Sequence, residues 1–265
     1  MPREITAFSN PLVKQVRALR DKRHRKDAQQ FLAEGLRILA EAEETGRIPR
    51  YLFHTAEMRD HPLVRNLTGW CEAAGGEAIE TNVDILHKLS GKDNPQTVLG
   101  VYDEFDTSLS AIDRTTADIW IVAQAIRDPG NLGTILRTGD AVGAGGLILI
   151  DECVDPFSVE AVRASMGAIF TQTIAQADWA EFLPWLRAGP GQLVGLSLRT
   201  EIDYREPRYA TPTFLLVGNE ARGLPAEYED ACDLRVKLPM RGKADSLNAA
   251  IATAVMAYQV LGQRV

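Results

Sequence analysis

Three polar, glycine-bearing segments hold the residue types in this chain that are best suited to chemistry. They are residues 128–137, 218–223 and 238–248, and each adjoins a short apolar stretch. An arginine such as Arg137 presents a rigid fork of donors that suits phosphate or ribose oxygens. Glycines such as Gly218 allow tight turns and the close approach of a ligand. Together the three segments favour a ligand site at a sheet edge, where the sites of α/β proteins form.

Each segment also has a purely structural interpretation when it is taken alone. Asp128 suits the N-cap of a helix, and Ser246 suits the N-cap of the last helix of the chain. A turn capped by Glu220 would account for the middle segment. These interpretations leave Asn131 and Arg137, six residues apart, without a structural role. The ligand site therefore depends on the conjunction of all three segments.

A glycine-rich run raises the alternative of a dinucleotide-binding domain. The run comprises Gly139, Gly143, Gly145 and Gly146. A nucleotide fingerprint lies between the first strand and its helix. These glycines instead follow the predicted helix and precede the next strand, where glycine most often caps a helix C-terminus. Their position argues against a dehydrogenase or a Rossmann-type methyltransferase.

The elements that would position these segments form two predicted α/β domains. Residues 1–102 alternate short strands with helices, residues 103–118 are polar and aperiodic and fit a linker, and residues 119–265 form the second domain. Continuous apolar strands alternate with helices in the second domain, which predicts a parallel sheet covered on both faces. Its strands are predicted at 119–123, 146–150, 192–196, 213–217 and 234–238, and its final helix at 248–261.

The charge of the chain is unevenly distributed. The net charge is −7, yet residues 1–27 hold eight lysine and arginine residues against three acidic ones, a net of +5, so the remainder carries −12. Apolar residues recur at helical spacing from Leu12 to Leu19, which predicts one amphipathic helix over 11–27 with a cationic outer face. Charge alone leaves open whether this face docks on a phosphate backbone or is only solvated. Its cations are Lys14, Arg17, Arg20, Lys22, Arg23, Arg25 and Lys26.

Composition limits the kinds of protein to which this chain can belong. The chain has 265 residues, 45% of them apolar, which suits a globular protein of about two domains. No run reaches the roughly 18 apolar residues of a membrane span, and no export signal is apparent, so we expect a soluble, cytoplasmic protein. Cys71, Cys153 and Cys232 are odd in number and far apart. They suggest neither a disulfide framework nor a metal site, and we expect them to be small buried hydrophobic residues.

The three polar segments, in this order and spacing, resemble the SpoU/TrmH family of RNA 2′-O-ribose methyltransferases, which use S-adenosylmethionine. In the N-terminal half, FLAEG at 31–35 and NPQTV at 94–98 look like the substrate-binding domain that is fused to many members. The resemblance covers most of the chain. It implies a small RNA-binding α/β domain, then a catalytic domain with a deep C-terminal trefoil knot, an exception to the rule that chains do not thread loops. It also implies a homodimer through the catalytic domain.

The resemblance further implies a role for individual residues. The catalytic set would be Asn131, Arg137, Glu220, Ser246 and Asn248, with no metal. Lys237 stands where an apolar residue is more usual, but this departure removes no chemical group that the family uses. The implied substrate is RNA, with ribosomal RNA favoured over tRNA, and a non-catalytic RNA-binding or ribosome-assembly protein of the same fold is the alternative. The cofactor-binding residues would be Leu196, Gly218, Asn219, Glu220, Gly223, Leu238, Met240 and Leu247.

Overall fold

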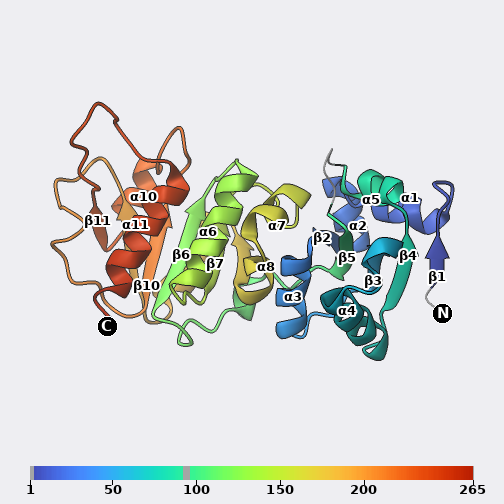
Figure 1. The fold of residues 1–265 in the computed structure, drawn as a ribbon. Helices are drawn as coiled ribbons and strands as arrows, with labels where there is room; N and C mark the ends of the chain where they lie inside the picture. The colour runs from blue at the N-terminus through green and yellow to red at the C-terminus, as the bar shows by residue number, and fades with distance from the viewer. Residues whose placement is uncertain (1–2, 92–95, 265) are drawn as a thin grey trace. The chain divides into compact units, whose positions relative to one another are not determined.

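The computed structural model describes residues 3–91 and 96–264, and Figure 1 shows its ribbon. Asn94 and Pro95 of the NPQTV segment lie outside the described residues. Contacts divide the chain into two compact units. Unit 1 comprises Met1–Phe105 together with Asp155–Thr171, and unit 2 comprises Asp106–Val154 together with Gln172–Val265. None of the helices within the described ranges combines the length and the apolar character that a membrane crossing requires.

Unit 1 contains a mixed five-stranded sheet. Its strand order is β1-β4-β3-β5-β2, in which β5 runs antiparallel to both of its neighbours. The strands are β1 (Arg3–Ile5), β2 (Gln30–Glu34), β3 (Tyr51–Thr55), β4 (Glu77–Thr81) and β5 (Val98–Asp103). The helices are α1 (Pro11–Ala18), α2 (Lys22–Ala28), α3 (Leu36–Glu44), α4 (Pro62–Ala73), α5 (Val83–Ser90), α7 (Val159–Ser165) and α8 (Ala168–Thr171).

The predicted basic helix is in fact two helices, α1 and α2. Asp21 breaks the run because its side chain accepts a hydrogen bond from the backbone N–H of Arg23 at 2.9 Å and so caps a new helix. The first helix still buries the predicted apolar stripe, which includes Val13 and Val16. The prediction of one continuous helix over 11–27 was therefore wrong at its midpoint, and the cations lie on two short helices and the turn between them.

A segment from the second half of the sequence packs in unit 1. Residues 155–171 were predicted to belong to the second domain, but Phe157 and Phe170 pack around Phe31, with ring centroids 5.0 and 6.0 Å from it. Arg25 also pairs with Asp155 at 2.6 Å. Aromatic packing and this ion pair place the segment with the N-terminal sheet.

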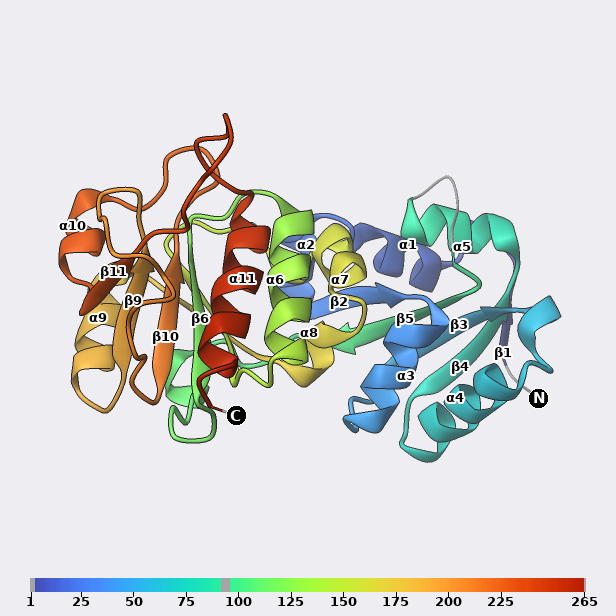
Figure 2. The same cartoon turned by 60° about the vertical axis from the view of Figure 1, so that its left-hand side comes forward.

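Unit 2 is built on the predicted parallel sheet. All six strands run parallel in the order β11-β9-β10-β6-β7-β8. Figure 2 shows α6 and α11 side by side along one face of this sheet. The strands are β6 (Ile119–Gln124), β7 (Gly146–Ile150), β8 (Thr173–Ala177), β9 (Gln192–Leu196), β10 (Thr213–Val217) and β11 (Leu234–Val236). The helices are α6 (Pro129–Ala141), α9 (Trp179–Arg187), α10 (Ala226–Asp230) and α11 (Ala249–Leu261).

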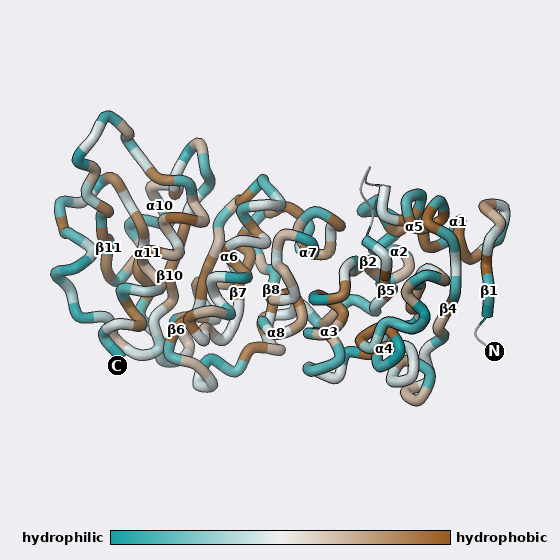
Figure 3. The backbone as a smooth tube through the Cα atoms, in the orientation of Figure 1, coloured by the Kyte–Doolittle hydropathy of each residue, from teal (hydrophilic) through white to brown (hydrophobic). Residues whose placement is uncertain are grey.

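Alternation along β10 explains why both faces of this sheet are covered. Phe214 and Leu216 pack with Phe182 of α9 on one face, whereas Leu215 packs with Met256 of α11 on the other. Figure 3 shows the apolar colouring of the central strands and of α11. Such a sheet buries nearly every strand residue, so functional side chains are left to the loops at the strand ends.

The three cysteines are free thiols, and the prediction that they are buried is confirmed in full only for Cys71. Cys71 is fully buried, while Cys153 and Cys232 are partly buried. Burial raises the pKa of Cys71 and of Cys153 to about 11, and that of Cys232 to about 12. All three thiols are therefore neutral at physiological pH and behave as small apolar side chains.

Candidate active site

A cavity of about 330 Å³ opens in unit 2 where three neighbouring strands, β9, β10 and β11, end. Leu196 is the last residue of β9, Gly218 directly follows β10, and Leu238 lies two residues beyond β11. The carboxyl ends of parallel strands meet at one edge of the sheet, which is the usual place for a ligand in this architecture. All eight residues predicted to bind the cofactor line this cavity: Leu196, Gly218, Asn219, Glu220, Gly223, Leu238, Met240 and Leu247.

The loop that follows β10 is rigidly built. The side-chain oxygen of Asn219 accepts hydrogen bonds from the backbone N–H groups of Ala221 and Arg222, and its Nδ2 donates to the carbonyl of Ala125 at 2.7 Å. A Cβ on Gly218 would lie only 2.4 Å from the carbonyl carbon of Gly223. Asn219 therefore shapes the loop. Gly218 is required because the loop's own backbone, rather than a ligand, fills the space beside it.

Three of the five predicted catalytic residues are joined by hydrogen bonds. Asn131, in the first turn of α6, donates from Nδ2 to Glu220 Oε1 at 3.0 Å, and Asn248 donates from Nδ2 to Asn131 Oδ1 at 2.8 Å. Because a carboxylate only accepts, the amide of Asn131 must turn its NH₂ group toward Glu220. These contacts hold the Glu220 carboxylate at the edge of the cavity.

The helix caps differ in part from the prediction. Asp128 caps α6, as predicted, by accepting a hydrogen bond from the Asn131 N–H at 2.7 Å. The cap of α11 is Asn248, whose Oδ1 accepts from the N–H groups of Ala250 and Ile251, so the assignment of that cap to Ser246 was wrong. Both polar atoms of the Asn248 amide are thus engaged. Ser246 lines the cavity and has no hydrogen-bond partner within 3–91 and 96–264.

Arg137 stands apart from the hydrogen-bonded set. It lies on α6 six residues beyond Asn131, which at 1.5 Å per residue is about 9 Å along the helix axis. Its side chain is exposed and forms no ion pair with any residue of the described ranges. A permanently charged guanidinium that no carboxylate neutralises is available to an anionic partner.

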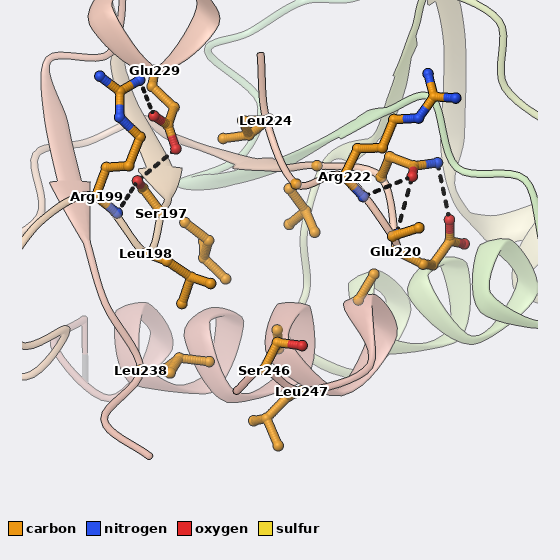
Figure 4. A pocket seen from close by; sticks show the side chains of 18 of the residues that line it. Ser197, Leu198, Arg199, Glu220, Arg222, Leu224, Glu229, Leu238, Ser246 and Leu247 are labelled. Atoms are coloured by element: carbon orange, nitrogen blue, oxygen red, sulfur yellow. Dashed lines mark hydrogen bonds and ion pairs between the residues drawn. The ribbon is translucent and has the colours of Figure 1, made fainter. Parts of the chain in front are cut away.

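The cavity walls are mainly apolar, with one polar end that sequence reasoning missed. Figure 4 shows Leu224, Leu238 and Leu247 around the space. At the polar end, the buried carboxylate of Glu229 accepts from Ser197 Oγ at 2.6 Å and from Arg199 Nη1 at 2.8 Å. Glu229 lies on α10 in a run of acidic residues, and no local signal marks it as the one that turns inward.

The predicted phosphate-docking cations all lie in unit 1, and one of them is not available. Arg25 is only 3% exposed, and its guanidinium donates to Asp155 Oδ2 and to the carbonyls of Leu19 and Arg20. It was wrongly included in the surface, because it holds the start of α2 to residues 155–171. The other six cations are exposed: Lys14, Arg17, Arg20, Lys22, Arg23 and Lys26.

Comparison with known proteins identifies relatives of the whole chain. Residues 118–258 match the SpoU rRNA Methylase family, and residues 10–100 match the MRM3-like substrate binding domain. A 23S rRNA (uridine(2479)-2'-O)-methyltransferase of Streptomyces viridochromogenes is 31% identical over 93% of this chain and 86% of its own length. The Bacillus subtilis 23S rRNA (guanosine(2553)-2'-O)-methyltransferase RlmP is 27% identical over 98% of this chain and all of its own length.

Solved structures give the same picture. The AdoMet-bound rRNA methyltransferase from Sinorhizobium meliloti superposes with a TM-score of 0.91 at 38% identity, over 99% of this chain and 98% of that one. This chain, with its two units and its cavity at the ends of β9, β10 and β11, therefore has the architecture of solved rRNA methyltransferases.

Proposed function

Because the chain belongs to the SpoU rRNA methylase family, we propose that it transfers a methyl group from S-adenosylmethionine to a ribose 2′-hydroxyl of ribosomal RNA. The observation that carries this proposal is the position of Glu220. This carboxylate lines the apolar cavity and is held by the hydrogen-bonded pair Asn131 and Asn248. The cavity that could hold a small molecule thus adjoins the fixed carboxylate of Glu220.

The cavity fits the cofactor in size and chemistry. About 330 Å³ lies within the range of small-molecule sites, and the leucine walls suit the flat, largely apolar adenine ring. The backbone groups of residues 218–223 that are not engaged within the loop supply polar contacts to the adenosine. Bound S-adenosylmethionine supplies an electrophilic methyl group. We propose that Leu196, Leu238, Met240 and Leu247 enclose it, while Asn219 and Gly223 act by shaping the loop.

The reaction needs little more than an aligned and activated hydroxyl, so positioning supplies a large part of the acceleration. Glu220 and Ser246 both line the cavity, and we assign them to the target ribose. Asn131 and Asn248 are positioning residues, because their side-chain atoms are engaged with Glu220 and with each other. Arg137 contacts the phosphate next to that ribose. Its guanidinium also stabilises the negative charge that develops on the ribose 2′-oxygen. A guanidinium does not serve as the base, because it stays protonated in proteins.

Methyl transfer and mapping of the product test this proposal. Purified protein with labelled S-adenosylmethionine is incubated separately with ribosomal RNA and with tRNA, and ribose methylation is mapped. We expect one 2′-O-methyl site in ribosomal RNA, and the same site should disappear from cells that lack the gene. Methylation of tRNA alone would show that the substrate is tRNA and not ribosomal RNA. Failure to bind S-adenosylmethionine in calorimetry would favour the non-catalytic RNA-binding alternative.

A matched pair of variants tests the cofactor cavity. Leu247 lines the cavity and is 41% exposed, whereas Ile202 is 40% exposed and is not part of the lining. Leu247→Asp places a charge against the cofactor and should weaken its binding by roughly tenfold or more, because a carboxylate would lose hydration there. Ile202→Asp should bind as the wild type does. Equal affinities for the two variants would place the cofactor elsewhere.

We assign RNA docking to the six exposed cations of α1, α2 and the turn between them. If Lys22, Arg23 and Lys26 each contact one phosphate, changing all three to Gln should flatten the plot of log affinity against log salt by roughly 0.7 per contact for single-stranded RNA. An unchanged slope would mean that these charges only face solvent. Arg25 is left out of the variant because its loss would disturb the fold.

The catalytic unit is also proposed to form a homodimer, to contain a trefoil knot and to work in the cytoplasm. Ile251 and Tyr258 are 51% and 54% exposed and lie seven residues apart on α11, so they share one face of that helix. An apolar stripe of this kind suits a partner helix. The knot and the location follow from the family resemblance.

A further inference from the structure

Unit 1 carries an exposed aromatic ring beside a groove lined by cations. Phe8 lies in the turn between β1 and α1 and is 44% exposed, whereas six of the seven other phenylalanines are buried. A ring left in water lacks the hydrophobic free energy of burial, so a ligand that covers the ring would gain it on binding. Lys88 of α5 places its Nζ 4.5 Å from the centroid of this ring.

The groove beside Phe8 is continuous with the predicted docking face. One hollow of about 470 Å³ is lined by Phe8, Arg17, Arg20, Asp84, His87, Lys88 and Gly91. A second hollow, of about 540 Å³, shares Arg17 and Arg20 with the first and adds Lys14, Ala18, Asp21 and His24. We call these two hollows together the Phe8 groove.

Packing fixes Arg20 at the centre of the groove. The guanidinium of Arg20 lies against Gly91, where an added Cβ would be 1.9 Å from Arg20 Cζ. Gly91 caps the C-terminus of α5 in the left-handed conformation, and a cation is favourable at that end of a helix. Within the described ranges, Arg17, Arg20 and Lys88 form no ion pair with a carboxylate. The groove thus presents three cations that no ion pair within those ranges engages, beside the carboxylates of Asp84 and Asp21.

We propose that the Phe8 groove binds an unpaired RNA nucleotide, with its base stacked on Phe8 and its flanking phosphates on Arg17 and Arg20. Proteins hold single-stranded nucleic acid by this combination of a basic groove and an aromatic platform. A paired helix would offer phosphates but no free base face. The inference rests on the proposed RNA docking and deepens it, because it specifies a single-stranded element of the RNA and extends the surface to α5.

Binding of the full-length chain to a 12-nucleotide oligoadenylate, across a salt series and without cofactor, tests the proposal. Phe8→Leu keeps an apolar side chain but removes the ring, and it should weaken binding by roughly tenfold with an unchanged salt slope. Arg17→Gln should instead flatten the slope by roughly 0.7. Phe8→Trp should restore affinity, and its fluorescence should be quenched on binding.

Two controls separate stacking from other effects. Ile48 is 45% exposed in the same unit, so Ile48→Ser shows whether loss of any exposed apolar side chain matters, and it should bind as the wild type does. A blunt-ended, fully paired RNA duplex should be insensitive to Phe8→Leu. Wild-type affinity of Phe8→Leu for oligoadenylate, or equal competition by an oligoglutamate peptide, would overturn the proposal. Methyl transfer is measured separately, so its failure and that of base stacking are distinguishable.

Discussion

Replacement of Arg25 by Met should destabilise unit 1. It should not remove a charge from the RNA-docking surface, because Arg25 is buried. The buried guanidinium makes four hydrogen bonds: two to Asp155 Oδ2, at 3.1 and 2.6 Å, and one each to the carbonyls of Leu19 and Arg20, at 2.8 and 2.9 Å. Methionine fills much of the same volume but makes none of them. The change therefore isolates the polar interactions.

The magnitude follows from the groups that would be left behind. Removing one partner of a buried ion pair typically costs about 3–5 kcal/mol, because the other charge is stranded. Asp155 is a milder case, since its side chain is 11% exposed and its Oδ1 still accepts from the Phe157 N–H at 2.9 Å. The two carbonyls lose partners as well, at about 1 kcal/mol each. We expect a net loss of about 3 kcal/mol.

Calorimetric or denaturant unfolding of the full chain measures this loss, with Lys26→Met as the matched control. Lys26 is the next residue along α2 and is exposed, so its replacement should change the free energy of unfolding by no more than about 0.5 kcal/mol. The double variant Arg25→Met, Asp155→Asn should recover much of the loss, because no charge remains unpaired while the amide oxygen can still accept from the Phe157 N–H. Equal unfolding curves for Arg25→Met and Lys26→Met would refute the structural role of Arg25.

Three further predictions concern other parts of the molecule. Arg137→Ala should leave cofactor binding intact in calorimetry while slowing methyl transfer by about a hundredfold or more, because its contact acts in the transition state; normal turnover would exclude that role. Tyr258→Glu, beside Ile251, should convert a dimer to a monomer in light scattering at micromolar concentration, and a monomeric wild type would contradict the interface. Arg59 donates to Glu80 at 2.7 and 2.5 Å and holds the pKa of that carboxyl below its ordinary value of 4.5. This stabilisation is present above that pH and is lost as the pH falls through the depressed pKa, so Arg59→Met should lower stability at neutral pH and flatten the acid limb of the stability profile; an unaltered limb would count against the pair.

Most strands of unit 2 are well predicted from the sequence because they are runs of mainly apolar residues buried on both faces. The predicted bounds 146–150, 192–196 and 213–217 match β7, β9 and β10. Strands β1, β2 and β8 were missed. β8 reads Thr-Ile-Ala-Gln-Ala, which has no long apolar run, and β1 has only three residues.

Residue roles that depend on distant partners could not be predicted. Seven cations near the N-terminus look alike in sequence, and only Asp155, 130 positions away, distinguishes Arg25 from the rest. Ser246 and Asn248 both suit a helix cap, and the backbone geometry alone decides between them. Local patterns report local energetics, whereas these choices follow from tertiary packing.

The position of residues 155–171 affects the order in which the protein can be completed during synthesis. The aromatic cluster around Phe31 needs Phe157 and Phe170, which leave the ribosome only after β6, α6 and β7 have been made. The N-terminal part of unit 1 therefore keeps some of its apolar surface uncovered while two of the six strands of the next sheet, β6 and β7, are translated. Cutting the gene after Phe105 would leave unit 1 without one wall of its core, so neither unit corresponds to a contiguous stretch of the gene.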